Sequence, residues 1–159
     1  MKIKHLIIGL FATLSLQSAI AQDYPTDYLT PEFHAGRRAA FKEKMSDKGV
    51  GIFFASQTRQ RSNDTEFQYA QNKNFYYLTG LEEPNAVLLL FKQPVTLLGK
   101  TGTEFIFVQN RDPFKELWTG KILGTEGFKA KSKMENVFIN DQFNSSSISS
   151  LLKEFIKPE

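Results

Sequence analysis

Apolar positions recur at helical spacing near both ends of the chain. In residues 31–45, Phe33, Ala40 and Phe41 follow this spacing among basic side chains, and Thr30-Pro31 gives an N-cap followed by a first-turn proline. Near the other end, Ser147 or Ser149 can cap a helix in which four apolar residues share one face: Ile148, Leu151, Leu152 and Phe155. The pattern predicts a helix at each end.

Between these helices the chain carries short runs that are rich in strand-forming residues. We expect strands at 50–55, 75–79, 86–91, 95–98, 104–109 and 137–139. The 86–91 run is apolar throughout, which is typical of a strand covered on both faces. Residues 99–102 predict a hairpin turn, and Asp112-Pro113 predicts a short helix over 114–118, after which several glycines interrupt the chain. The predicted class is α/β, with a mixed β-sheet flanked by helices.

The first 21 residues have a different character from the rest. Lys2 and Lys4 precede an apolar run from Leu6 to Leu16, and a small-residue cleavage pattern ends at Ala21. This tripartite pattern predicts a signal peptide, 1–21, and one domain, 22–159; the apolar run is too short to span a bilayer. We therefore expect export to the periplasm or the outside, and no membrane association after cleavage.

Composition narrows the possible partners. Two of the 20 basic residues fall within the predicted signal, so the remaining basic residues nearly balance the 17 acidic ones. That balance predicts no nucleic-acid partner. The chain has no Cys, which excludes disulfides, Cys-containing metal sites and a lipid-modified Cys.

Familiar catalytic motifs do not occur in the sequence. His34, the one His outside the predicted signal, lies in the first predicted helix and is expected at its surface. There is no HExxH, P-loop, GxGxxG or GxSxG pattern. The residues alone give no metal site or catalytic constellation.

Two polar segments are candidates for a functional role. In residues 61–65, Arg61 and Asp64 either form a local ion pair that shapes the loop or belong to a loop held ready to present its side chains. In residues 110–120, Trp118 is either a packing residue or an aromatic wall at the edge of a cleft.

Five motifs occur in a fixed order along the chain. They are Gly36-Arg37-Arg38; Arg61-Ser62-x-Asp64-Thr65; Gln71-Asn72-x-Asn74 followed by Phe75-Tyr76-Tyr77-Leu78-Thr79-Gly80; Glu83-Pro84-x-Ala86-Val87-Leu88; and Asn110-Arg111-Asp112 with Glu116-Leu117-Trp118-Thr119-Gly120. From about Pro31 to about Phe155, their order and spacing resemble the N-terminal domain of Xaa-Pro aminopeptidase (aminopeptidase P), within the creatinase and prolidase group.

The resemblance implies a two-domain metallopeptidase. In that family, two divalent ions, usually Mn²⁺, are bound by two Asp, one His and two Glu in a C-terminal pita-bread domain. A metal-bound hydroxide attacks the bond between the N-terminal residue and a following proline. We expect that domain to be absent from this chain, which would leave it without a metal site and inactive alone. The complete enzyme would act on proline-containing peptides and form a homo-oligomer.

The resemblance also implies roles for particular residues. Asp64, Arg61, Trp118, Arg111 and Asp112 become candidates for positions near the substrate or a subunit interface, and no catalytic residue is expected. Ala70 departs from the family pattern, in which many members have Arg immediately before the Gln that is Gln71 here. Such a change removes a fixed charge and up to five donors.

Three other interpretations remain open. The first is a stand-alone, non-catalytic module that binds peptides or proteins. The second is the matching part of a prolidase or creatinase, and the third is a relic without function. The 110–120 motif favours the aminopeptidase over prolidase and creatinase.

Overall fold

A four-stranded mixed sheet in the order β1-β4-β5-β6 is the centre of the molecule. The computed structural model describes residues 29–144 and 146–156. Strands β1, β4 and β5 are antiparallel neighbours, and β6 runs parallel to β5. The elements are α2 (Pro31–Glu43), β1 (Val50–Phe54), β2 (Gln60–Ser62), β3 (Thr65–Glu66), α3 (Lys73–Thr79), β4 (Val87–Leu97), β5 (Lys100–Val108), α4 (Pro113–Thr119), α5 (Gly124–Ser132), β6 (Val137–Ile139), the 3₁₀ helix η1 (Asn140–Asn144) and α6 (Ser146–Ile156).

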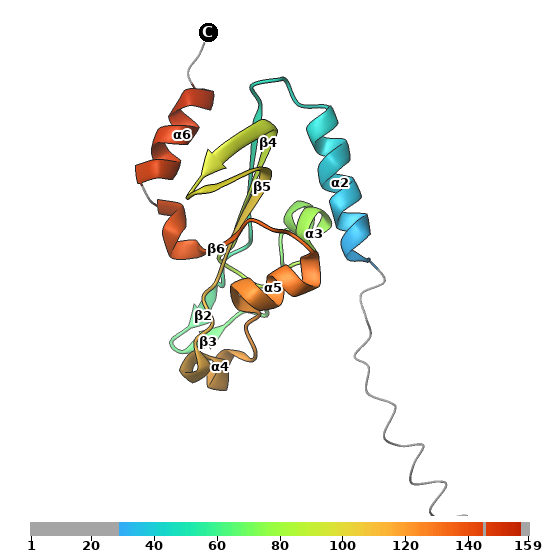
Figure 1. The fold of residues 1–159 in the computed structure, drawn as a ribbon. Helices are drawn as coiled ribbons and strands as arrows, with labels where there is room; N and C mark the ends of the chain where they lie inside the picture. Colours follow the sequence, from blue (N-terminus) through green and yellow to red (C-terminus); the bar gives the residue numbers. More distant parts are fainter. Residues whose placement is uncertain (1–28, 145, 157–159) are drawn as a thin grey trace, which may run out of the picture.

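Helices cover both faces of this sheet, which confirms the predicted α/β class (Figure 1). On one face, Leu88 and Leu90 of β4 pack with residues of α3 and α5. On the other face, Leu89 and Phe91 pack with the predicted apolar face of α6. Because successive side chains of a strand point to opposite faces, β4 is buried on both sides, as its uninterrupted apolar sequence predicts.

The 73–79 segment is a helix, so the prediction of a strand at 75–79 is wrong. Asn72 Oδ1 accepts hydrogen bonds from the backbone N of Asn74 and of Phe75, at 2.9 and 3.1 Å, and Gly80 ends the helix with φ +66°. Phe75, Leu78 and Thr79 are buried, which is the i, i+3, i+4 spacing of one helical face. Local capping therefore outweighs the strand propensity of the aromatic residues.

The helix α5 and the position of His34 also differ from the predictions. Gly124 begins α5 in a stretch where glycines were expected only to interrupt the chain. His34 is buried, and its Nδ1 lies 2.9 Å from the backbone O of Tyr77. A Cβ at Gly80 would come within 2.6 Å of His34 Nε2, so a residue without a side chain allows this contact between α2 and α3.

A charged cluster connects α2, α3 and β5. Arg38 is 3% exposed; its Nε donates to Glu104 Oε2 at 2.7 Å and its Nη1 donates to the backbone O of Leu78 at 2.9 Å. Lys42 Nζ lies 2.7 Å from Glu104 Oε1. Burial alone would raise the pKa of Glu104, but the charges and hydrogen bonds of Arg38 and Lys42 outweigh it and lower that pKa. The cluster is therefore a compensated buried charge.

No helix in the part of the chain that the structure describes is long and apolar enough to cross a membrane.

Replacing Glu104 with Ala should destabilise the domain strongly, because Arg38 would stay buried without its carboxylate. We expect a loss of about 3 kcal/mol or more in the free energy of unfolding, measured by urea denaturation. This contribution should be present above the unfolded-state pKa of about 4.3 and be lost as pH falls through the lower folded-state pKa.

The control is Glu135→Ala, which removes the exposed pair with Lys129 (3.2 Å) and should cost about 1 kcal/mol at most. Equal effects of the two substitutions would contradict the role assigned to Arg38 and Glu104.

Candidate functional site

Helix α4 is held in place by polar contacts that start at its N-terminal end. Asp112 Oδ1 accepts hydrogen bonds from the backbone N of Phe114 and of Lys115, at 3.0 and 3.3 Å. Arg111 donates twice to Glu116, from Nε at 2.8 Å and from Nη2 at 3.2 Å. The hydrogen bond from Arg111 lowers the pKa of Glu116, and Glu116 raises that of Arg111. A helix of seven residues needs such contacts, because it is too short to be stable alone.

The apolar side chains of α4 face solvent. Phe114 is 74% exposed, Leu117 75% and Trp118 83%, and no residue of this helix is buried. The interpretation of Trp118 as a residue packed in the core is therefore wrong for this chain. An exposed apolar group of this size usually marks a surface that contacts something else.

Trp118 lines a cleft of about 510 Å³ beside α4. The cleft is also lined by Glu66 of β3, by Thr58 and Tyr69 beside the β2–β3 hairpin, and by Glu83 in the loop after α3. The cleft thus lies between α4, from the predicted 110–120 segment, and residues that flank the predicted 61–65 segment on both sides. Its volume is in the range of small-ligand sites.

Glu83 was missed by the sequence analysis, although it lies in a recognisable Glu-Glu-Pro-Asn turn. Its Oε1 accepts a hydrogen bond from the backbone N of Leu123 at 2.7 Å, just before α5. Its Oε2 is buried and is the one such side-chain atom without a partner among the described residues. Burial raises the pKa of Glu83, partly opposed by the Leu123 hydrogen bond and the charge of Lys131.

The predicted site residues fall into two groups. Arg111 and Asp112 shape α4, while Trp118 lines the cleft. Arg61 lies in β2 and Asp64 in the turn before β3, both exposed and outside the lining of the cleft. Among the described residues, no ion pair joins Arg61 to Asp64; the guanidinium carbon of Arg61 instead lies 6.0 Å from the ring centre of Phe67. The prediction that the five candidate residues lie near the substrate or a subunit interface stays a prediction.

The described residues contain no group of three or more His, Asp or Glu side chains that could hold a metal ion. The cleft and α4 together present a capped helix with exposed aromatic side chains beside a cavity.

An α/β domain with these elements occurs in solved aminopeptidases. The structure is similar to aminopeptidase P from Escherichia coli, solved with the inhibitor Pro-Leu, with a TM-score of 0.64 and 30% identity over 74% of this chain and 26% of that one. It is similarly close to proline aminopeptidase P II from Yersinia pestis, with a TM-score of 0.62 and 33% identity over the same shares.

The sequence comparison gives the same family. The chain is 33% identical to the Xaa-Pro aminopeptidase of Escherichia coli over 108 residues, which is 68% of this chain and 24% of that protein. It is 33% identical to Xaa-Pro aminopeptidase 3 of Homo sapiens over 105 residues, 64% of this chain and 20% of that protein. The family model described as aminopeptidase P, N-terminal domain, matches residues 34–156. The chain belongs to this family, which confirms the resemblance, and spans about a quarter of the length of these relatives.

Glu83→Gln should change how stability depends on pH. The folded-state pKa of Glu83 lies above the unfolded value, so the folded protein binds more protons and its stability falls as pH rises through that interval. The variant cannot ionise there. We measure the free energy of unfolding of both proteins by urea denaturation. As pH rises from 4 to 8, the value for the variant should increase relative to the value for the unmodified chain.

The matched control is Glu82→Gln, which neutralises the exposed neighbouring carboxylate. A gain of the same size in both variants, or none in Glu83→Gln, would contradict the burial of an unpaired carboxylate oxygen.

Trp118 should be freely accessible in the isolated chain. It is the single Trp of the sequence, so intrinsic indole fluorescence reports on this residue alone. We expect acrylamide to quench it nearly as well in the folded chain as in the chain unfolded in urea. A folded state with strongly protected fluorescence would show that α4 packs against another surface, such as a second copy of the chain.

Proposed function

We propose that this chain supplies the N-terminal, substrate-entrance and oligomerisation domain of an exported Xaa-Pro aminopeptidase. Such an enzyme is a metallopeptidase that releases an N-terminal residue linked to proline. The observation that carries the proposal is α4, a helix fixed by polar caps whose three large apolar side chains have no place in the core of the domain. A second domain or subunit would cover them and complete the cleft.

Two Mn²⁺ ions are proposed for the complete enzyme, held by residues outside this chain. Such ions would lower the pKa of a bound water and polarise the carbonyl group of the peptide bond. The part assigned to this chain is different: Trp118 and the wall that carries Tyr69 would border the path by which a proline-containing peptide enters.

A second candidate is a stand-alone module that binds peptides or proteins without catalysis. It is favoured by the same exposed side chains of α4, because a binding surface needs no metal. The two candidates differ in what the DNA immediately downstream encodes. An adjoining reading frame with the Asp, Asp, His, Glu and Glu ligands favours the enzyme, and a frame without them favours the binding module.

The purified chain, supplied with Mn²⁺, should leave an Ala-Pro-type peptide intact, because residues 29–144 and 146–156 contain no group of side chains that could hold a metal ion. Release of the N-terminal residue is measured against a metal-free control. Turnover above that control would overturn the proposed division of roles.

If an adjoining frame encodes the five metal ligands, a second experiment expresses that catalytic segment together with this chain. We expect hydrolysis of the peptide that requires both segments and that falls when Trp118 is replaced by Ala. Hydrolysis by the catalytic segment alone, at an equal rate and without this chain, would argue against a role at the substrate entrance.

A further inference from the structure

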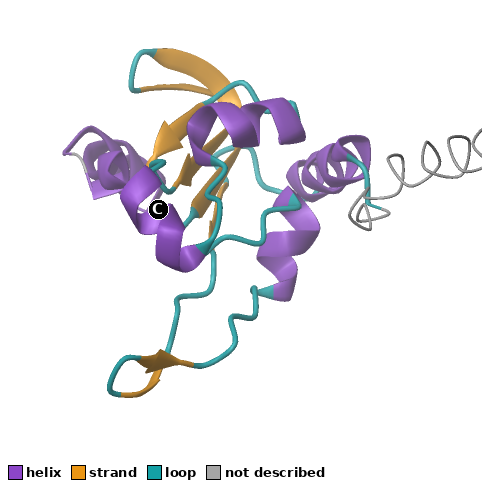
Figure 2. Ribbon diagram, turned by 90° about the horizontal axis from the view of Figure 1, so that it is seen from below, coloured by secondary structure: helices purple, strands orange, loops and turns teal. Residues whose placement is uncertain are grey.

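The β2–β3 hairpin is carried away from the sheet on two extended segments, residues 56–59 and 67–70, which we call the legs (Figure 2). At the hairpin end, the backbone N of Phe67 donates to the backbone O of Arg59 at 2.9 Å. At the other end, Gln71 Oε1 accepts from the backbone N of Ser56 at 2.9 Å. The legs are therefore tied together at their two ends.

Between these ties the legs enclose a cavity of about 600 Å³, which we call the slot. One hydrogen bond of the described residues reaches across it, from the hydroxyl of Tyr69 to the backbone O of Ser56, at 3.3 Å. Burial raises the pKa of Tyr69 to about 12, so this hydroxyl stays protonated and keeps donating. The volume of the slot is within the range of small-ligand and peptide-side-chain sites.

The backbone along the slot is unusually free. In the described part of the chain, the backbone groups of Gln57, Thr58, Gln68 and Ala70 have no hydrogen-bond partner. Extended segments with unpaired N–H and C=O groups can accept another extended chain by strand addition. The legs thus offer main-chain partners to a ligand that has an extended backbone.

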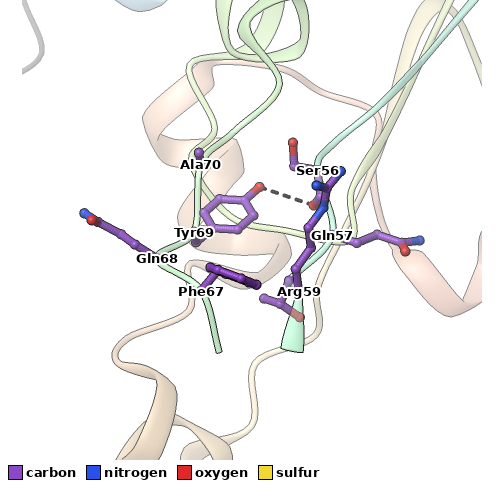
Figure 3. A pocket seen from close by; sticks show the side chains of 8 residues that line it. Ser56, Gln57, Arg59, Phe67, Gln68, Tyr69 and Ala70 are labelled. Carbon is purple, nitrogen blue, oxygen red and sulfur yellow. Dashed lines mark hydrogen bonds between the residues drawn. The ribbon is translucent and has the colours of Figure 1, made fainter. Parts of the chain in front are cut away.

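The side chains of the slot add aromatic surface and one positive charge. The rings of Phe67 and Tyr69 extend from one leg toward the other, where the Arg59 side chain lies, whereas Gln57 and Gln68 point away (Figure 3). Arg59 is the one charged residue among those that line the slot. It has no acidic partner among the described residues. A guanidinium group presents a planar fork of donors that matches a carboxylate.

We propose that the slot between the legs binds an extended peptide segment that carries a carboxylate. The ligand backbone pairs with the free groups of the legs, its side chains contact the rings of Phe67 and Tyr69, and its carboxylate binds Arg59. The slot shares Thr58 and Tyr69 with the cleft beside α4, but this binding requires neither catalysis nor a second domain, so its test does not depend on the proposed function.

The small side chain of Ala70 keeps the slot open. Ala70 lines the slot and is exposed, so a larger residue at this position would occupy the space that the ligand needs. The departure from the family pattern at this position therefore has a local consequence, because it removes a long side chain from the edge of the slot.

The test is a titration of the ¹⁵N-labelled chain with the acetylated and amidated peptide Thr-Val-Glu-Val-Thr, followed by amide chemical shifts. We expect saturable shifts at residues 56–59 and 67–70. The peptide with Gln in place of Glu should bind about tenfold more weakly or worse, because a hydrogen-bonded charge pair is lost. Methylation of the two Val backbone nitrogens should abolish binding, because those nitrogens can no longer donate.

Two variants locate the site. Arg59→Gln should weaken the Glu peptide about tenfold while leaving the Gln peptide unchanged. Ala70→Leu should weaken both peptides, because it fills the slot without changing the charge. The control is Lys48→Gln, which removes one positive charge at the opposite end of β1 and should change neither affinity. Unchanged shifts away from the legs show that each variant is folded.

The proposal would be overturned by an absence of shifts at the legs, by equal affinities for the Glu and Gln peptides, or by an Arg59→Gln effect no larger than that of Lys48→Gln. Leg shifts that depend on protein concentration and not on peptide would assign the slot to a second copy of the chain, and would overturn it as well.

Discussion

The arrangement of this domain depends on one buried residue: the side chain of Arg38 extends from α2 and binds both α3 and β5. A buried guanidinium is tolerable only when its donors are paired, and here they bind Glu104 on β5 and the carbonyl of Leu78 on α3. The position of α3 is therefore fixed relative to the sheet by hydrogen bonds as well as by apolar packing. His34 adds a second polar contact to the same helix, through the backbone O of Tyr77.

Fixing α3 also fixes the segments on either side of it. Gln71, which precedes α3, accepts from Ser56 N and Asn72 N and donates to the backbone O of Leu81 and of Glu83. One side-chain amide thus ties the base of the legs to the loop that follows α3. Glu83 then connects this loop to the start of α5 through Leu123 N. The cleft beside α4 and the slot between the legs share this support, and each lies outside the two apolar cores.

The sequence predicts the central parts of the fold better than these connections. The strands around β4 and the amphipathic α6 follow from local periodicity, since burial on a sheet face or helix face repeats along the chain. The strand expected at 75–79 is wrong because the caps at Asn72 and Gly80 decide the conformation of an aromatic segment that suits either state. His34 and Arg38 are buried by partners 40 or more residues away in the sequence, and no local pattern reveals such partners.

The candidate site shows the same division. The short helix and its Asp112 cap are predictable, because a cap and its helix are adjacent in the sequence. The exposure of Trp118 is not, since an aromatic residue at this spacing is usually buried and only the position of α4 relative to the sheet decides. The alternative in which Arg61 pairs with Asp64 fails for a related reason: Phe67, which directly follows β3, offers Arg61 an aromatic surface that the spacing of charges does not reveal.

The polar contacts of α4 explain how a domain can keep large apolar side chains in solvent without losing its shape. Caps and an ion pair stabilise this helix locally, so its apolar residues are free of any part in folding the core. The legs follow the same logic, with ties at both ends and free backbone between them. In both places the fold fixes the backbone with polar bonds and leaves side chains or main-chain groups available for contacts with other molecules.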